Sequence, residues 1–349
     1  MTSPGSWVRW VRGRLGERGL AVAAMAGLLA LGGVPLVALP AVRCEVFGGG
    51  CREPRPEEVR ADPVSAPGKG LTPVEAATWG SYVALGDSYS AGVGAEASIA
   101  DQNPLERCHR TSKAYYHEVS KAFAFPKGSA FWACSGATTA DVRDGRHGEP
   151  SQLGRIGADT SLVTMSVGGN DIGFSKVVAG CVVKLPWSGS CTRQGGDIAG
   201  KMSDLRRNLP ALIAEVHARA PRARIVLMGY PKAFSEVKGT SGDNISVTEQ
   251  QWLNARAYDL GQLVRQAAAE ADARIAARRG QGSVEFVDAY SAFAGHEVGS
   301  SDPYMNGLTL NLSAFQAEAR SYHPTVNGQH ALAGLFIEQI KKGPGRRLS

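Results

Sequence analysis

Short apolar runs alternate with longer helical patterns from Ser81 onward, and this alternation limits the possible folds more than any other feature of the chain. The predicted strands are short and mainly apolar: Tyr82–Leu85, Ala130–Cys134, Leu162–Val167, Arg224–Gly229 and Ser283–Asp288. The segments with helical spacing are Ala114–Phe123, Met202–Ala218, Thr248–Arg279 and Gly328–Lys341. Strands that alternate with helices predict an α/β fold in which helices cover both faces of a parallel sheet.

The chemically unusual residues follow the predicted strands, where parallel sheets bind their ligands. Ser88 follows the first strand, in Gly86-Asp-Ser-Tyr-Ser90. The next two strands lead into Cys134-Ser-Gly-Ala-Thr-Thr139 and Ser166-Val-Gly-Gly-Asn-Asp-Ile-Gly173, and Ser321-Tyr-His-Pro-Thr-Val-Asn-Gly328 precedes the last helix. Each segment alone is compatible with an ordinary turn or helix cap. Their order and their joint position at strand ends indicate an active site.

The residue types in these loops fit acyl transfer. A serine hydroxyl is a poor nucleophile until a base removes its proton, and His323 is the candidate base for Ser88. The tetrahedral intermediate also needs hydrogen-bond donors for its oxyanion. The candidates are the backbone N–H groups of Ser88 and Gly136 and the side-chain amide of Asn170. Glycine suits this role because no side chain crowds its N–H.

At these residues the sequence resembles the SGNH hydrolases, also called GDSL lipases or esterases, and in particular the secreted actinobacterial esterases and lipases of that group. The matching positions are Gly86-Asp-Ser88, Gly136, Gly168-Gly-Asn170-Asp171 and His323-Pro324. The resemblance runs from about Ser81 to Lys341. It implies a three-layer α/β/α sandwich with a central parallel, flavodoxin-like sheet. It also implies Ser88 as nucleophile, His323 as base, and an oxyanion hole of Ser88, Gly136 and Asn170, without a metal or an organic cofactor.

One position departs from the family pattern. Most members have Asp three residues before the histidine, where it orients the imidazole, and here that position is Arg320. Some secreted actinobacterial relatives lack the acid, and a backbone carbonyl at that position accepts the hydrogen bond instead. The resemblance therefore implies a Ser–His dyad in which the backbone carbonyl of Arg320 orients His323. Glu318 and Asp302 are alternative acids for this role.

The predicted function is an extracytoplasmic serine ester hydrolase of the esterase or lipase type that works through an acyl-enzyme. Its substrate would be a lipid or an acylated small molecule or glycan, and a transferase or thioesterase role stays open. The alternative is a catalytically silent relative that binds a glycan or lipid at the cell surface, which Arg320 at the acid position favours. The loop Val177–Gly196 contains the apolar residues Val182, Val183, Leu185 and Trp187. It is either an apolar wall for an acyl chain or a surface loop closed by a disulfide.

A membrane-targeting segment precedes the predicted domain. Leu20–Val42 carries no charged side chain, is about long enough to span a bilayer, and follows the arginines Arg9, Arg12, Arg14 and Arg18. Pro35 and Pro40 favour a signal peptide, but no Ala-x-Ala site precedes Arg43. We expect an uncleaved anchor with the domain on the extracellular side of the cell membrane. Secretion after cleavage is the alternative.

These features divide the 349 residues into four parts. Residues 1–43 are a basic region with the anchor or signal segment, and residues 44–79 are a linker rich in Pro, Arg and Glu. Residues 80–342 are the SGNH hydrolase domain, and residues 343–349 are a basic tail. We expect a monomer. The net charge of +6 lies partly in the two termini, and no basic stripe with interleaved aromatic residues occurs, so we expect no nucleic-acid partner.

The six cysteines fall into near-neighbour pairs along the chain. Their spacing alone decides no pairing, but an oxidising exterior favours disulfides. Zinc is disfavoured because the chain has no CxxC motif and no pair of histidines at ligand spacing. Relatives of the resembling type often carry three bridges in the catalytic domain, of which the third is absent here. The resemblance implies Cys108–Cys134 and Cys181–Cys191, and leaves Cys44–Cys51 to close a small loop beside the membrane.

Overall fold

A computed structural model describes residues 70–96, 107–182, 190–239, 244–311 and 316–348. The chain divides into two compact units, Met1–Gly68 and Lys69–Ser349. All described residues belong to the second unit, which is called the main domain below. The predicted anchor, most of the predicted linker and the pair Cys44–Cys51 lie outside the described residues.

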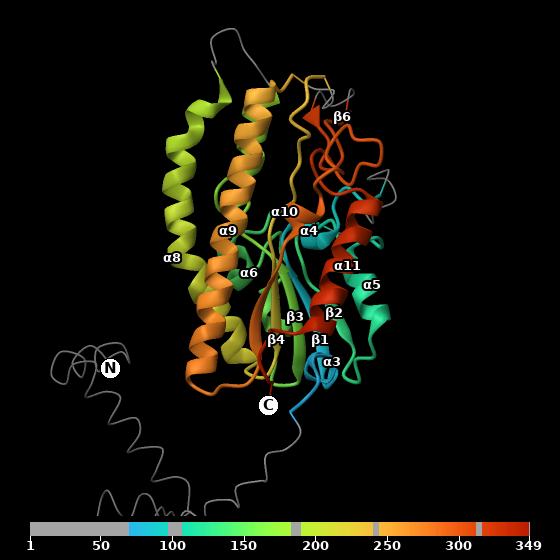
Figure 1. Cartoon of the computed structure of the whole chain (residues 1–349), viewed down its shortest axis with the longest axis vertical. Helices are drawn as coiled ribbons and strands as arrows, with labels where there is room; N and C mark the ends of the chain where they lie inside the picture. The colour runs from blue at the N-terminus through green and yellow to red at the C-terminus, as the bar shows by residue number, and fades with distance from the viewer. Residues whose placement is uncertain (1–69, 97–106, 183–189, 240–243, 312–315, 349) are drawn as a thin grey trace, which may run out of the picture. The chain divides into compact units, whose positions relative to one another are not determined.

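A five-stranded parallel sheet forms the centre of the main domain (Figure 1). Its strands are β1 (Ser81–Gly86), β2 (Ser129–Phe131), β3 (Thr160–Ser166), β4 (Arg224–Met228) and β5 (Ser283–Val287). They lie in the order β2-β1-β3-β4-β5, and each neighbouring pair is parallel. Every residue of β3 and β4 is buried, as expected for strands that are covered on both faces. This is the flavodoxin-like order, with its switch point between β1 and β3.

Helices cover both faces of the sheet (Figure 1). The two longest, α8 (Gly195–Arg219) and α9 (Val247–Ala277), pack against each other on one side, and α9 contacts β4 and β5. On the other side, α5 (Tyr115–Ala122) packs against α11 (Val326–Lys342). The predicted α/β/α sandwich around a parallel sheet is confirmed.

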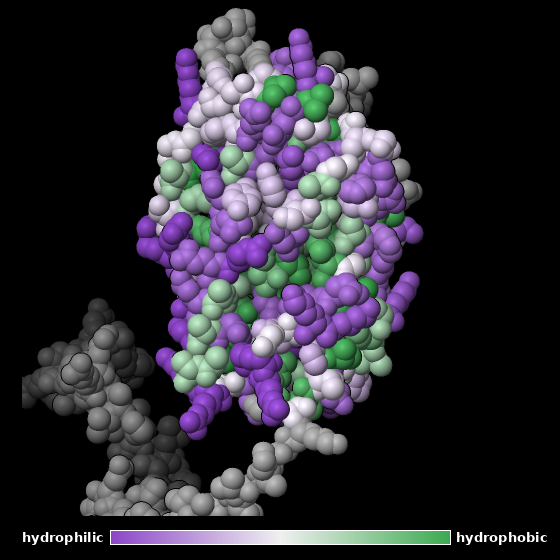
Figure 2. Space-filling view, in the orientation of Figure 1, coloured by the Kyte–Doolittle hydropathy of each residue, from purple (hydrophilic) through white to green (hydrophobic). Residues whose placement is uncertain are grey.

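Short elements occupy the connections between these layers. They are α3 (Pro73–Thr78), α4 (Ser88–Ala91), α6 (Thr139–Asp144), α7 (Phe174–Val182), α10 (Ala289–Ala292), the 3₁₀ turns η3 (Gln152–Arg155) and η4 (Cys191–Gln194), and the strands β6 (Leu310–Asn311) and β7 (Gln316–Ala317). On the face seen in Figure 2, hydrophilic side chains cover most of the surface and apolar ones form small patches between them. Many apolar side chains of the strands and helices are buried in one hydrophobic core.

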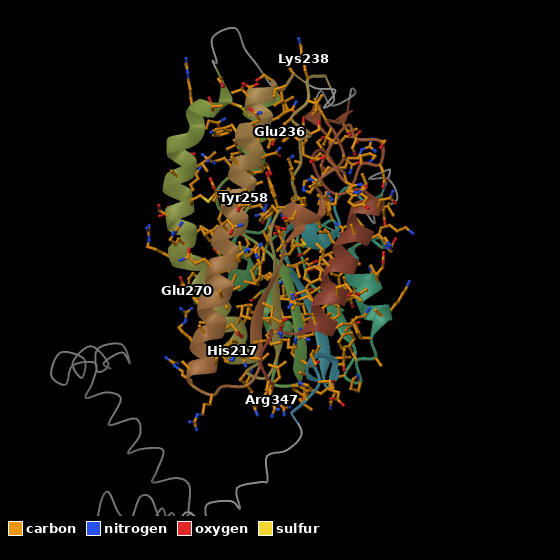
Figure 3. All side chains as sticks on the ribbon, in the orientation of Figure 1. His217, Glu236, Lys238, Tyr258, Glu270 and Arg347 are labelled. Carbon is orange, nitrogen blue, oxygen red and sulfur yellow. A yellow bond between two sulfur atoms is a disulfide. The ribbon has the colours of Figure 1, made fainter. Side chains whose placement is uncertain are left out.

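The carboxyl ends of the strands point toward one end of the domain. Figure 3 shows Glu236 and Lys238, which follow β4, at this end, and His217, which precedes β4, toward the opposite end. The loops that carry the predicted active-site residues follow β1, β2 and β3, and so begin at the same edge of the sheet. This arrangement lets residues far apart in the sequence meet there.

The main domain is longer at both ends than the predicted range 80–342. Thr72 and Glu75 form a capping box that starts α3, and the carbonyl of Pro73 accepts a hydrogen bond of 2.7 Å from Arg224. At the other end, Leu348 is buried and forms a β-bridge with Leu71. The end of the predicted linker and the predicted tail are thus parts of the fold, because their apolar and backbone groups pack onto the sheet and its helices.

Two of the predicted disulfides are present. Cys108–Cys134 joins the loop before α5 to the segment that follows β2, and Cys181–Cys191 joins the end of α7 to η4. Among the described residues, no helix is long and apolar enough to cross a membrane. In the same part of the chain, no group of three or more His, Cys, Asp or Glu side chains is arranged to hold a metal ion.

Candidate active site

Ser88 lies at the tight turn between β1 and α4. Asp87 caps this helix by accepting a hydrogen bond of 3.0 Å from the N–H of Tyr89, and Ser88 is its first residue. Gly86 ends β1 with φ of +116°, and a Cβ atom there would lie 2.2 Å from the carbonyl oxygen of Ser166 on β3. Only glycine permits this close approach. The Gly-Asp-Ser sequence thus places a serine at the edge of the sheet, where its side chain lines a cavity.

His323 comes from the segment before α11, and its Nε2 atom lies 2.8 Å from Oγ of Ser88. Its Nδ1 atom lies 3.0 Å from the carbonyl oxygen of Ser321. A carbonyl oxygen only accepts hydrogen bonds, so Nδ1 carries the proton and Nε2 presents its lone pair to the serine hydroxyl. Burial lowers the pKa of His323 to about 4. The ring is therefore neutral at neutral pH and able to accept a proton.

The carbonyl of Arg320 has a different partner from the one predicted, and its assignment as the group that orients the imidazole was wrong. It accepts a hydrogen bond of 3.1 Å from the main-chain N–H of His323, which closes a turn. Within this turn Tyr322 has φ of +56°, and the carbonyl that lies within 3.0 Å of the imidazole Nδ1 is that of Ser321. The backbone of Ala319 also interacts with the ring. The orienting group is a backbone carbonyl, as expected, but it lies one residue nearer to the histidine.

Both acids considered as replacements for the missing aspartate have other partners. The carboxylate of Glu318 accepts a hydrogen bond of 2.6 Å from Nε of Arg320. The carboxylate of Asp302 lies 3.5 Å from Nδ1 of His296. The imidazole of His323 is consequently held by a neutral acceptor and not by a negative charge.

Gly136 and Asn170 line the same cavity as Ser88 and His323. Gly136 has φ of +77°, in the loop that follows β2. The side-chain amide of Asn170, after β3, donates a hydrogen bond of 3.1 Å to the carbonyl of Ala137. An amide carries two N–H groups, so this bond leaves a second one for a ligand. The structure thus brings the four predicted residues, Ser88, Gly136, Asn170 and His323, to one cavity.

A sequence model of the GDSL-like lipase/acylhydrolase family matches residues 84–331. This range contains the four residues above and covers more than half of the chain. The chain belongs to this family. The resemblance to the SGNH hydrolases noted from the sequence is thereby confirmed.

Curated relatives of this GDSL hydrolase are lipases from Streptomyces. Lipase 1 of Streptomyces coelicolor is 34% identical over 249 residues, which are 71% of this chain and 82% of the relative. A lipase of Streptomyces rimosus is 32% identical over 252 residues, which are also 71% of this chain and 82% of the relative. The predicted enzyme class, a carboxylic ester hydrolase, is confirmed.

Two solved structures share the fold over nearly their whole length. Phospholipase A1 from Streptomyces albidoflavus NA297 has a TM-score of 0.61 at 30% identity, covering 75% of this chain and 99% of that one. An extracellular lipase from Streptomyces rimosus has a TM-score of 0.60 at 29% identity, covering 74% of this chain and 99% of that one. The α/β architecture of the GDSL hydrolase is thus that of solved lipases.

Asp87 is the centre of a buried hydrogen-bond network that sequence reasoning missed. Its carboxylate accepts hydrogen bonds from the hydroxyls of Ser166, at 2.6 Å, and Tyr230. The Tyr230 oxygen in turn accepts a bond of 2.8 Å from the N–H of Gly169. Burial raises the pKa of Asp87 to about 6, although these donors favour the charged form. The network links the ends of β1, β3 and β4, and nothing in the sequence signals that Tyr230 belongs to it.

The candidate active site of the GDSL hydrolase opens into a cavity of about 430 Å³. Beyond the polar residues described above, its wall is mainly apolar and includes Phe174, Val178, Val182, Phe234, Ala257 and Leu308. Val182 thus lies where the predicted apolar wall requires it. Val183, Leu185 and Trp187 of that prediction lie outside the described residues. An apolar cavity next to a serine suits the hydrocarbon part of an ester.

Proposed function

We propose that the main domain hydrolyses carboxylic esters through an acyl-enzyme, with Ser88 and His323 as a catalytic dyad. The observation that carries this proposal is the 2.8 Å contact between Oγ of Ser88 and Nε2 of His323, in a ring whose Nδ1 proton is held by a carbonyl. Hydrogen-bond reach between nucleophile and base is the geometry that nucleophilic catalysis requires.

In the first half of the reaction, Nε2 of His323 takes the hydroxyl proton as Oγ of Ser88 bonds to the ester carbon. The carbonyl oxygen becomes an oxyanion, which the N–H groups of Ser88 and Gly136 and the amide of Asn170 stabilise. The imidazolium then gives its proton to the leaving alcohol as the ester C–O bond breaks, and the acyl group stays on Ser88.

In the second half, water attacks the acyl-enzyme and His323 removes a proton from it. The same donors stabilise the second oxyanion. As this intermediate collapses, the bond between the acyl carbon and Oγ of Ser88 breaks, the imidazolium returns its proton to Oγ, and the carboxylic acid leaves. The carbonyl of Ser321 keeps the imidazole in the productive tautomer throughout both halves. An orienting carboxylate would also fix the tautomer, and its negative charge would stabilise the imidazolium. The carbonyl stabilises the imidazolium only through its dipole.

The proposed substrates are esters with an apolar acyl chain. The mainly apolar cavity beside Ser88 supports this class, as do the relatives that are named lipases. The alternative of a catalytically silent binding protein depended on the missing acid. It loses that support because the carbonyl of Ser321 provides the orienting hydrogen bond.

Replacement of Ser88 or His323 by Ala tests the dyad. We expect each variant to lose hydrolysis of p-nitrophenyl butyrate by about three orders of magnitude or more, while circular dichroism and the melting temperature stay near those of the wild type. A fluorophosphonate probe should label the wild type and not the Ser88→Ala protein, because only an activated serine reacts. Equal turnover in the Ser88→Ala protein would exclude Ser88 as the nucleophile.

We also propose that the domain acts outside the cytoplasm. Its two disulfides suit an oxidising compartment, and a structural relative is an extracellular lipase. The anchored form stays a prediction, with the secreted form as its alternative, since Leu20–Val42 lies outside the described residues. Fractionation of expressing cells distinguishes membrane-bound from released enzyme, and accumulation in the cytosol would contradict both.

A further inference from the structure

Arg146 lies directly behind the loop that carries Gly136. Its Nε atom donates a hydrogen bond of 3.1 Å to the carbonyl oxygen of Ser135 and lies 3.0 Å from Nε2 of His147. Its Nη1 atom binds the carboxylate of Asp141 at 3.1 Å. The guanidinium is thus held at several points against the backbone of the candidate oxyanion hole.

The contact with Ser135 bears on the oxyanion hole because of peptide geometry. The C=O group of Ser135 and the N–H group of Gly136 belong to one planar trans peptide unit and point in opposite directions. A group that holds the Ser135 oxygen from behind therefore sets the direction of the Gly136 N–H. A positive charge next to that oxygen also polarises the peptide and makes its N–H a stronger donor.

The space around Gly136 agrees with this arrangement. A Cβ atom at position 136 would lie 2.7 Å from Nη2 of Arg146, so the guanidinium occupies the volume that any side chain would need. Glycine therefore permits both the positive φ of this residue and the close approach of the arginine.

The loop is held from two directions. Asp141 anchors the arginine and also accepts hydrogen bonds from the N–H and hydroxyl of Thr138, in the capping box of α6. From the other direction, Asn170 binds the carbonyl of Ala137 at 3.1 Å, and Asp171 accepts bonds from Thr139. The peptide between Ser135 and Gly136 lies just before these contacts, and Arg146 holds its carbonyl.

We propose that Arg146 is a positioning residue that orients and polarises the Gly136 N–H for the oxyanion. This inference rests on the proposed ester hydrolysis. It assigns to Arg146 no contact with the substrate. Its effect should therefore show in the transition state and not in substrate binding.

The test compares Arg146→Ala and Arg146→Lys with Arg143→Ala. Arg143 is a matched control because it lies on α6, is similarly exposed and pairs with Glu215 at 3.2 Å, in a contact that leaves the oxyanion loop untouched. We expect Arg146→Ala to lower kcat for p-nitrophenyl butyrate by about 10- to 100-fold, somewhat less than complete removal of an oxyanion donor. KM should change little, and the control should keep the wild-type kcat.

Two further readouts separate positioning from a general loss of structure. A trifluoromethyl ketone forms a tetrahedral oxyanion on the serine, so its inhibition constant should rise in proportion to the fall in kcat/KM. Free guanidinium, at a concentration too low to unfold the domain, should restore part of the activity of Arg146→Ala. Lysine lacks the planar fork that reaches both Asp141 and Ser135, so Arg146→Lys should be intermediate.

An unchanged kcat in Arg146→Ala, an equal loss in Arg143→Ala, or a loss confined to KM would overturn the role of Arg146. If Arg146→Ala does not fold, the same comparison with Arg146→Lys decides. These outcomes differ from failure of the proposed function. A wild-type protein that hydrolyses no ester, or a Ser88→Ala variant that still does, removes the function and this inference with it.

Discussion

At the scale of single residues, the imidazole of His323 makes its hydrogen bonds without a carboxylate partner. Its Nδ1 proton is held by the carbonyl of Ser321, which sets the tautomer but brings no charge to support the imidazolium. Burial then lowers the pKa of the ring to about 4, well below the ordinary value of a histidine. The proposed base therefore stays unprotonated in acidic solutions in which most histidines are charged.

This predicts the acidic limb of the pH profile. We expect kcat/KM for a neutral ester to fall only as the pH drops toward an apparent pKa of about 4, because protonation of His323 in the free enzyme removes the base.

The same shift in the pKa of His323 makes the stability of the fold depend on pH. His323 binds fewer protons in the folded state than in the unfolded chain between about pH 6.5 and 4, so its contribution to stability falls as the pH is lowered through that window. Asp87, whose pKa burial raises to about 6, contributes with the opposite sign as the pH falls below about 6.

A stopped assay below pH 5, paired with thermal melts at each pH, separates loss of the base from unfolding. The profile should be measured with a substrate that has no titratable group. An acidic limb centred near pH 6.5 in a folded protein would show that the ring is not buried as the structure places it.

At the scale of elements, α7 forms part of the cavity wall, and a disulfide holds its last turn. It starts after the loop of Asn170, and the disulfide Cys181–Cys191 ties its last turn to η4. Val178 and Val182, one helical turn apart, line the cavity from this helix. The identity of α7 side chains should therefore decide how much of an acyl chain the enzyme accepts.

We predict that Val178→Trp selectively reduces hydrolysis of long-chain esters. The larger ring fills cavity volume, so kcat/KM for p-nitrophenyl decanoate should fall about 10-fold or more, the scale on which apolar pockets discriminate. Hydrolysis of the acetate should change little, because its acyl group needs no such space. Lys176→Trp is the control, since Lys176 is exposed on the same helix. An equal loss for acetate and decanoate would contradict the acyl-wall role.

At the scale of the whole domain, a buried ion pair joins the two ends of the folded chain to the sheet. Arg224 on β4 binds Glu285 on β5 through two hydrogen bonds of 2.8 and 2.6 Å, and both side chains are almost fully buried. The same guanidinium donates to the carbonyls of Pro73 in α3 and of Gln339 and Ile340 in α11. Arg224 begins its strand, so this network lies at the edge of the sheet opposite the candidate active site.

We predict that Arg224→Met lowers the free energy of unfolding by about 3–5 kcal/mol, because it leaves the buried carboxylate of Glu285 without its cation. Urea denaturation measures the loss. The specific activity of the folded fraction should stay near that of the wild type. Arg207→Ala, which removes an exposed pair with Asp204, should cost less than about 1 kcal/mol. Similar losses in the two variants would contradict the role given to Arg224.

Local patterns in the sequence were enough to predict the sandwich, its strands and the four residues of the candidate site. Strand and helix periods, turn glycines and polar residues after strands are signals that neighbouring residues carry by themselves. A parallel sheet then brings strand ends to one edge, so Ser88, Gly136 and Asn170 meet without any knowledge of distances. The two disulfides within the domain followed from the family resemblance.

The hydrogen-bond partners of the site had to come from the folded arrangement, both within one turn and between separate elements. The turn that uses the carbonyl of Arg320 leaves Ser321 to hold His323, and this depends on backbone angles that no side-chain pattern encodes. Tyr230 reaches Asp87, and Arg146 reaches Ser135, only after separate elements have packed. The ends of the domain at α3 and Leu348 likewise became part of it through burial. Such partners are selected by packing and hydrogen-bond satisfaction in three dimensions, and a linear pattern carries no record of them.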